Sequence, residues 1–308
     1  MAVLFLFVCF GEGAGNACTT FSFNHDGKPI FGRNFDWPTG KGSVIINQRG
    51  IKKTAQSYDV TNQLAWVSKY GSATFNQIGR DFPYGGMNEA GLVVETMMLN
   101  DTQYPSSSGL RPEIDLFQWI QYQLDNFSTV QEVIESDSKI KIKARTGAHF
   151  LICDYKGNCA VIEFLDGQLV YHTKETLPVS ALSNTKYSEA IRFWSTNQLP
   201  KNDRRRSVGR FIRAANMMED YNSQTQEPVD YAFTILSSVS NPSDTQWSIV
   251  YDIANRCIYF RTKINRKIRY FDIKEFNFSS STSSKMIDVN DNFSGDVSGN
   301  FVNYNYRN

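Results

Sequence analysis

The sequence carries almost no net charge, because 32 Lys and Arg residues are balanced by 31 Asp and Glu residues, leaving +1. It has no basic stripe interleaved with aromatic residues, so its charge pattern does not favour a nucleic-acid partner. After residue 10, no apolar run approaches the roughly 20 residues that a membrane helix needs. We therefore expect a mature chain without a nucleic-acid-binding face and without a membrane span.

Histidine is scarce in this sequence. Its three positions are His25, His149 and His172, and no H-x-x-x-H or C-x-x-C spacing occurs. This pattern argues against a zinc site, and residues 40–42 lack the spacing of a phosphate-binding loop. We expect the protein to need neither a metal nor a cofactor.

Of the five cysteines, four lie after residue 17, which is too few for a disulfide framework. Cys153 and Cys159 flank a predicted hairpin turn, so they could face each other on paired strands. In an oxidising compartment they could form one bridge. The pattern is equally compatible with two separate thiols.

The first 17 residues are typical of a short secretory signal peptide. An uncharged start and an apolar run over residues 3–10 lead to the small residues Gly15 and Ala17, at positions −3 and −1 of a cleavage site. We expect removal of residues 1–17 and export to the periplasm or the medium. A lipoprotein signal is the weaker interpretation, because Gly15 stands where a larger aliphatic residue is expected.

Cleavage after Ala17 would make Cys18 the N-terminal residue, with a thiol and a free α-amine on the same residue. The amine titrates near about 7.7–8.0 and the thiol near about 8.5. The amine could therefore accept the thiol proton around neutral pH without a histidine.

The rest of the chain alternates between strand-like and helix-like patterns. Strand patterns come first, then helices mixed with strands, then strands again, which favours a layered α+β fold with antiparallel sheets. Without an internal repeat or a Pro/Gly-rich linker, residues 18–278 are predicted to form a single domain. Residues 279–308, rich in Ser and Asn, are predicted to form a frayed tail. We expect strands over residues 19–23, 29–36, 43–48, 91–99, 148–154, 160–164, 168–173, 247–252, 257–261 and 268–273, helices over 113–126, 128–136, 186–194, 207–221 and 230–238, a Ser128 N-cap on the second helix, and a turn at Gly85-Gly86.

Arg33 and Asp36 follow Cys18 closely in the sequence. Residues 19–23 and 29–36 read as a hairpin, which brings the second strand back alongside Cys18. A guanidinium near the sulfur favours the thiolate and lowers the pKa of the thiol. A carboxylate near the α-amine holds it by a charge-assisted hydrogen bond.

Several blocks in order resemble the choloylglycine hydrolase family, the N-terminal-nucleophile enzymes that include conjugated bile salt hydrolases and penicillin V acylases. The first pair of blocks is CTTF at Cys18 and FGRNFD, which contains Arg33 and Asp36. The GMNE-x-GL motif follows at residues 86–92. Later blocks are LSN, ending at Asn184, GRFIR, containing Arg210, and residues 244–247.

This resemblance implies a four-layer αββα sandwich of two antiparallel sheets and a set of catalytic roles. Cys18 is implied to be the nucleophile, with its own α-amine as general base, and Asp36 to orient that amine. Arg33 and Arg210 are implied to lie near the sulfur, and the Asn184 side chain to donate to the oxyanion. Members of the family often form homotetramers.

One family position departs from the pattern. Bile salt hydrolases carry an asparagine after the GMNE strand and some penicillin V acylases carry a tyrosine, whereas a gap-free count places Met98 there. Its backbone N–H remains available as an oxyanion donor, but the side-chain role is lost. Aromatic residues near the predicted site loops are expected to line an apolar acyl pocket: Trp37, Tyr58, Trp66 and Phe82.

These features predict an enzyme that hydrolyses a linear carbon–nitrogen amide bond of a small molecule, such as a conjugated bile salt, penicillin V or an N-acyl amine. Two alternatives remain at this stage. One is a Cys–His thiol hydrolase that uses His149. The other is an unprocessed, inactive homologue that acts as a binding protein.

Overall fold

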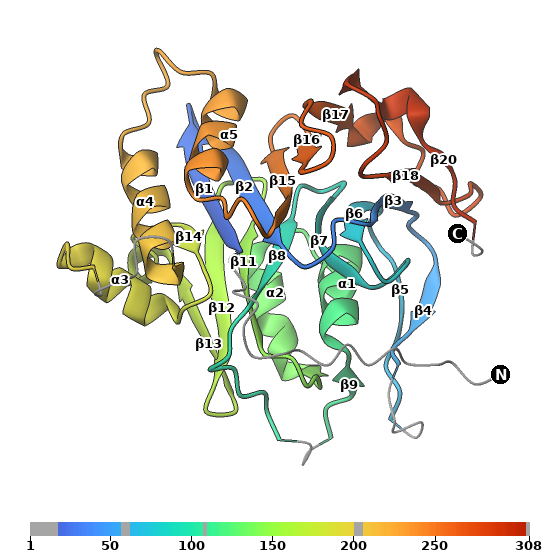
Figure 1. The fold of residues 1–308 in the computed structure, drawn as a ribbon. Coiled ribbons are helices and arrows are strands. Elements are labelled where there is room, and N and C mark those ends of the chain that lie inside the picture. Colours follow the sequence, from blue (N-terminus) through green and yellow to red (C-terminus); the bar gives the residue numbers. More distant parts are fainter. Residues whose placement is uncertain (1–17, 57–61, 107–109, 200–205, 306–308) are drawn as a thin grey trace.

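Two antiparallel sheets lie face to face at the centre of the molecule, and helices cover their outer faces (Figure 1). The structure is a computed structural model, and it describes residues 18–56, 62–106, 110–199 and 206–305. The predicted four-layer αββα sandwich is confirmed. Among the described residues, no helix is both long enough and apolar enough to cross a bilayer.

The first sheet contains both N-terminal strands. Its seven strands run in the order β14-β1-β2-β15-β16-β17-β19, antiparallel except for the pair β17–β19. Helices α4 and α5 pack on its outer face, with α3 beside α4. The bounds are β1 Thr19–His25, β2 Lys28–Asp36, β14 Ala181–Leu182, β15 Thr245–Asp252, β16 Cys257–Thr262, β17 Arg269–Asp272, β19 Gly295–Asp296, α3 Tyr187–Ser195, α4 Ser207–Glu219 and α5 Pro228–Ser238.

The second sheet has nine strands in the order β13-β12-β11-β8-β7-β6-β3-β18-β20, and α1 and α2 cover its outer face. Two short ribbons, β4–β5 and the parallel pair β9–β10, lie outside both sheets. The bounds are β3 Ser43–Asn47, β4 Lys52–Thr54, β5 Ala65–Val67, β6 Ser72–Asn76, β7 Pro83–Asn88, β8 Val93–Met98, β9 Glu113–Ile114, α1 Leu116–Asn126, α2 Val130–Glu135, β10 Lys141–Ile142, β11 Ala148–Cys153, β12 Cys159–Leu165, β13 Gln168–Thr173, β18 Lys285–Asp288 and β20 Val302–Asn303.

The β1–β2 hairpin forms as its sequence predicts. Asp26 and Gly27 both have positive φ, 49° and 83°, the conformation of a tight two-residue hairpin turn. The turn sets the register, so that Thr20 pairs with Arg33 and Thr19 with Asn34. This register brings the end of β2 alongside the start of β1.

The predicted turn at Gly85-Gly86 is wrong, because both glycines lie within β7. They are required by close packing. A Cβ on Gly85 would lie 2.1 Å from Oε2 of Glu95, and one on Gly86 would lie 2.4 Å from the Ala73 carbonyl oxygen. In a strand, glycine often marks such an approach rather than a turn.

The frayed tail predicted from residue 279 is also wrong for its described part. Strand β18 pairs with β3 and with β20, and so extends the second sheet. Val289 and Val297 are fully buried in the core. Low local hydrophobicity concealed strands that are stabilised by pairing with a distant segment.

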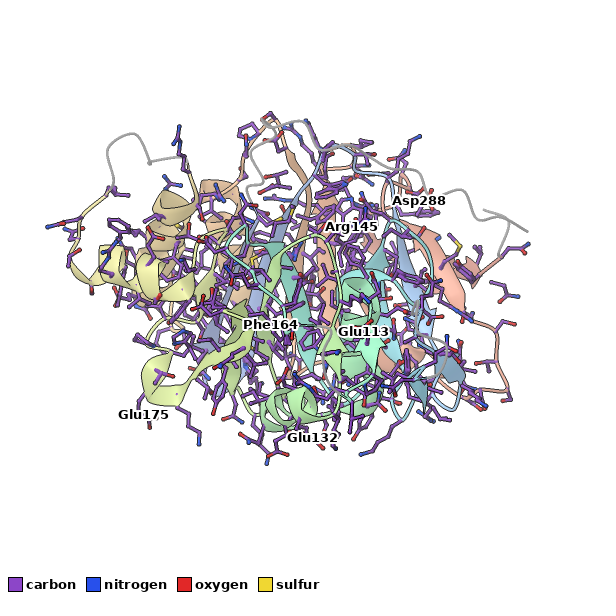
Figure 2. All side chains as sticks on the ribbon, turned by 90° about the horizontal axis from the view of Figure 1, so that it is seen from below. Glu113, Glu132, Arg145, Phe164, Glu175 and Asp288 are labelled. Atoms are coloured by element: carbon purple, nitrogen blue, oxygen red, sulfur yellow. A yellow bond between two sulfur atoms is a disulfide. The ribbon has the colours of Figure 1, made fainter. Side chains whose placement is uncertain are left out.

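Two helix starts differ from the predictions. Glu113–Ile114 form the short strand β9, and Asp115 caps α1 by accepting a hydrogen bond from the Phe117 N–H. Thr129, not Ser128, is the N-cap of α2, in a capping box with Glu132. Figure 2 labels Glu132 at the lower edge of the molecule.

The bridge that the cysteine spacing left open is present. Cys153 and Cys159 are paired in register on β11 and β12, and their sulfur atoms are bonded. Cys18 and Cys257 are the free cysteines of the described residues, and both are buried.

Candidate active site

The Cys18 sulfur lies at the start of β1, in contact with β2. The Arg33 Nη2 donates to Sγ at 3.8 Å, and the Asp36 backbone N–H donates to it at 3.5 Å. The thiol in turn donates to the Asp36 carbonyl oxygen at 3.8 Å. The hairpin register therefore brings Cys18, Arg33 and Asp36 together, as the sequence predicts.

Burial raises the pKa of the Cys18 thiol, since the residue is only 5% exposed. The Arg33 guanidinium lowers this pKa, in the predicted direction, but the effect of burial is larger. The thiol is therefore held in its protonated form. A base must remove the proton before the sulfur can act as a nucleophile.

Asp36 is buried, with 1% exposure, and neither of its carboxylate oxygens has a hydrogen-bond partner in the described part of the chain. Burial raises its pKa to about 6, against the opposing effects of the neighbouring Thr245 side chain, which is the largest of them, and of Arg210 and Arg33. Buried polar groups are normally satisfied, so an unpartnered carboxylate calls for an explanation, and a catalytic role is one such explanation. This carboxylate is suited to accept a charged N–H donor close to Cys18.

Arg210 reaches the start of β1 from α4. Its Nε donates to the Thr19 hydroxyl at 3.1 Å, and its Nη2 donates to the Asn184 Oδ1 at 3.0 Å and to the Cys18 carbonyl oxygen at 3.5 Å. The predicted grouping of Arg210 with Cys18 is thus present. These contacts join Arg210 to the main chain of Cys18 rather than to its sulfur.

Asn184 follows β14 and also contacts the end of β8. Its Nδ2 donates to the Met98 carbonyl oxygen at 2.9 Å. A side-chain amide carries two N–H groups, so one can hold Met98 while the other serves a ligand. The structure thus places Asn184 and Met98 side by side. The oxyanion role of the Met98 N–H stays a prediction.

The aromatic predictions have mixed outcomes. Trp37 is partly buried and stacks on Phe35 with ring centroids 6.0 Å apart. Trp66 is not at this site, because it packs with Tyr122 of α1 in a hydrophobic cluster separate from the one that contains Cys18. Its indole N–H donates to Asp125 at 2.7 Å.

Tyr58 lies outside the described residues, and Phe82 is half-buried just before β7. Tyr84, which the sequence did not single out, is the aromatic residue of β7 at the site. Its ring lies 5.0 Å from Phe35 and 5.9 Å from Trp37. Burial raises the pKa of its phenol to about 12, and the charges of Arg33 and Cys18 also act on it.

His149 is fully buried and engaged elsewhere. Its Nδ1 lies 3.1 Å from the Glu163 carboxylate, which also accepts the backbone N–H of Tyr187 at 3.0 Å. The hydrogen-bonding partners of the Cys18 sulfur are Arg33 and Asp36. The geometry therefore does not support a Cys–His pair.

Glu95 and Tyr251 were also missed by the sequence analysis. Glu95 forms a buried ion pair with Arg33 at 2.8 Å, and the Tyr251 hydroxyl donates to the same carboxylate. For Glu95, the sequence did offer a sign of a functional position, because it is the single acidic residue in the apolar run GLVVETMML. In the described part of the chain, no group of His, Cys, Asp and Glu side chains is arranged to hold a metal ion.

Known proteins share both the sequence and the fold. A penicillin V acylase of Pectobacterium atrosepticum is 25% identical over 347 residues, covering 94% of this chain and 91% of the relative. The structure of a penicillin V acylase from Agrobacterium tumefaciens matches with a TM-score of 0.80 and 25% identity, over 94% of this chain and 98% of that chain.

A variant of the conjugated bile acid hydrolase from Clostridium perfringens shares the fold, with a TM-score of 0.75 and 21% identity over 94% of this chain and all of that one. The family model described as linear amide C–N hydrolases, choloylglycine hydrolase family, matches residues 18–294. Its match covers most of the 308 residues and begins at Cys18. The chain therefore belongs to the choloylglycine hydrolase family of linear amide C–N hydrolases.

Proposed function

We propose that this chain is an N-terminal-nucleophile amidase in which removal of residues 1–17 makes Cys18 the nucleophile and its α-amine the general base. The observation that carries this proposal is the buried Asp36 carboxylate beside Cys18, which has no hydrogen-bond partner among the described residues. A protonated α-amine at Cys18 would satisfy it by a charge-assisted hydrogen bond. The start of the family match at Cys18 supports the same processing site.

In the proposed reaction the α-amine takes the Cys18 thiol proton, and the sulfur attacks the amide carbonyl carbon. The tetrahedral intermediate carries its negative charge on oxygen, where the free N–H of the Asn184 amide and the Met98 backbone N–H donate to it. The ammonium then protonates the departing amine as the carbon–nitrogen bond breaks. Water, deprotonated by the same α-amine, hydrolyses the thioester and releases the carboxylic acid.

Arg33 and Arg210 support this chemistry from two sides. Arg33 contacts the sulfur at 3.8 Å, so it stabilises negative charge there while the thiol loses its proton. Arg210 links the Thr19 hydroxyl, the Cys18 carbonyl and Asn184, so it fixes the oxyanion donor relative to the nucleophile.

We infer an apolar, ring-containing acyl group, as in the phenoxyacetyl group of penicillin V. Trp37 and Tyr84 lie next to Phe35, which flanks Arg33 with its ring centroid 5.4 Å from the guanidinium carbon. Aromatic faces offer a large apolar contact area for such a group. A hydrolysis panel of penicillin V, glyco- and tauro-conjugated bile salts and N-acyl amides tests this, with penicillin V expected to be cleaved fastest.

The mechanism is tested by intact mass and by two variants. The active protein is expected to begin at Cys18, and active protein that retains Met1 would sink the mechanism. Cys18→Ser should abolish turnover, whereas His149→Ala should leave most of it. The reverse pattern would favour the thiol hydrolase that uses His149, and inactivity of every form would favour a binding protein.

The leader also carries a prediction about location. We propose that the protein is exported to the periplasm or the medium, and that the cut that exports it also creates its general base. Cell fractionation combined with N-terminal sequencing checks this. Full-length, uncut protein in the cytosol of the native host would contradict it.

A further inference from the structure

Glu95 lies in the middle of β8 and points into the space between the two sheets. It is 1% exposed, and its Oε2 lies 2.8 Å from the Arg33 Nη1. The Tyr251 hydroxyl, from β15 of the opposite sheet, donates to Oε1 at 2.5 Å. Three strands from two sheets thus meet at a single carboxylate.

This contact constrains the direction of the Arg33 side chain. The Nη1 of Arg33 donates both to Glu95 and to the Thr96 carbonyl oxygen. A guanidinium is planar and rigid, so two contacts at one nitrogen set the orientation of the whole group. The other terminal nitrogen, Nη2, is then directed at the Cys18 sulfur, 3.8 Å away.

The fold reserves space for this carboxylate. Gly85 on β7 is the register partner of Glu95 on β8. A Cβ at Gly85 would lie 2.1 Å from Oε2 and 2.2 Å from the carboxylate carbon of Glu95. Gly85, which the sequence had suggested was part of a turn, therefore leaves space for the Glu95 carboxylate that holds Arg33.

Stability alone is a poor reason for this arrangement. Burial raises the pKa of Glu95 to about 7, against the opposing effect of Arg33, so keeping the carboxylate ionised in this position is costly. Well-packed apolar residues often replace a buried ion pair without loss of stability. An ion pair that directs a donor at the nucleophile has a use that apolar packing cannot supply.

We propose that Glu95, held by Tyr251, is a positioning residue that aims the Arg33 guanidinium at the Cys18 sulfur. The proposal rests on the proposed role of Cys18 as nucleophile and adds a device for controlling its thiol. Glu95 itself does not contact the sulfur in this arrangement. Its effect passes through Arg33.

The test compares Glu95→Ala with Glu95→Gln by the rate of Cys18 alkylation with iodoacetamide between pH 6 and 9. Both variants remove the negative charge, and that change alone favours the thiolate and speeds alkylation. Glutamine keeps an oxygen acceptor for Arg33, whereas alanine does not. We expect Glu95→Gln to react at least as fast as wild type, and Glu95→Ala to react about ten- to a hundred-fold more slowly at pH 7.

Asp125→Asn is the matched control. Asp125 is also a buried carboxylate held by a cation, Lys53, and by an aromatic donor, Trp66. We expect this variant to lose stability without a change in the alkylation profile of Cys18. Peptide mass analysis must locate the label, because Cys257 is a second free thiol.

Tyr251→Phe keeps the test decisive if Glu95→Ala fails to fold. It removes one hydrogen bond to Glu95 and leaves every charge in place, so we expect alkylation to slow by about three- to ten-fold. Equal or faster alkylation in Glu95→Ala than in Glu95→Gln overturns the proposal, as does an unchanged rate in Tyr251→Phe.

Alkylation reports on the thiol whether or not any amide is cleaved, so the fate of this proposal is separable from that of the amidase. If no amide in the panel is hydrolysed, the amidase proposal fails while the alkylation rates still decide the role of Glu95. If the amidase is active and alkylation is insensitive to Glu95 and Tyr251, only the positioning role fails.

Discussion

Asp36 and Asp125 are both buried aspartates, and burial raises the pKa of each, yet their surroundings differ. The Asp125 carboxylate accepts hydrogen bonds from the Lys53 ammonium at 2.9 Å, the Trp66 indole N–H at 2.7 Å and the Gln121 amide at 2.8 Å. Both of its oxygens therefore have donors. Asp36 has no hydrogen-bond partner for either oxygen in the described part of the chain.

The difference is the basis for the role that we propose for Asp36. A buried charge that only supports the fold is normally paired and hydrogen-bonded within the fold. Asp125 with its donors Lys53, Trp66 and Gln121 fits that rule. The group lies on and beside α1, next to the hydrophobic cluster on the outer side of the second sheet. The Asp36 carboxylate lies beside a buried thiol, with Thr245, Arg210 and Arg33 near it but no hydrogen bond to either oxygen among the described residues.

The largest expected effect comes from exchanging the two carboxylates for amides. Asp36→Asn should lower kcat by about 10³-fold, because the α-amine loses the anion that holds it and general-base catalysis is worth about 10²–10⁴. Asp125→Asn should keep kcat and lose about 1–3 kcal/mol of stability. Steady-state kinetics and urea unfolding of both variants measure this, and equal kinetic losses would erase the contrast.

Asn184→Ala should have the next largest effect. Loss of one oxyanion donor costs about 10²–10³ in kcat, and this variant also removes the contact with Arg210 at 3.0 Å. The loss should fall on kcat more than on KM, because the donor acts in the transition state. A change confined to KM would contradict the oxyanion role.

The pH dependence of stability should distinguish the uncut chain from the cut one. A carboxyl whose pKa is raised by folding stabilises the fold below its unfolded pKa, and this stabilisation is lost as pH rises through the folded pKa. The rise of the Asp36 pKa from 3.8 to about 6 corresponds to about 3 kcal/mol lost between about pH 4 and pH 7.

After cleavage the Cys18 ammonium should lower the Asp36 pKa and reduce that loss. The raised pKa of Glu95, about 7, makes stability fall with pH in the cut and the uncut protein alike. The difference between their two stability profiles therefore reports on Asp36. Urea unfolding of cut and uncut protein from pH 4 to pH 7.5 provides the measurement, with Asp36→Asn as control. Identical profiles would remove the support for an amine beside Asp36.

Tyr84→Ala should give the smallest effect, and it should act on substrate choice. One methylene group in an apolar pocket already discriminates between substrates by about 10- to 200-fold, so removal of the Tyr84 ring should change substrate preference measurably. We expect the ratio of kcat/KM for penicillin V to that for a linear N-acyl amine to fall, with Tyr84→Phe retaining most of it. Trp66→Ala serves as the control, since Trp66 lies outside this aromatic cluster.

Much of the site could be predicted from local sequence. Cys18, Arg33 and Asp36 lie on one hairpin, whose turn at Asp26-Gly27 determines their register. Asn184 and Arg210 were found through family-like blocks, and the structure brings both to the start of β1. The structure shows their contacts, and their catalytic roles remain proposals.

The missed residues share a physical cause. Glu95 and Tyr84 lie on β8 and β7 of the second sheet and reach the site because the two sheets pack face to face. Tyr251 reaches it because β15 pairs with β2, a strand more than 200 residues earlier in the chain. A strand pattern indicates which residues point inward, but neither which distant strand will pair beside it nor which residues it will meet on the other sheet. Trp66 was misplaced for the same reason, since its aromatic character did not reveal which side of the second sheet it would occupy.

The sequence by itself determined the order of the chemical groups, the hairpin that joins three of them and the family to which they belong. Only the tertiary structure decided that Glu95 meets Arg33, that Gly85 makes room for it and that residues after 279 complete a sheet. Such contacts depend on the register and packing of strands far apart in the chain. Their energies arise between segments, so no local pattern of residues carries them.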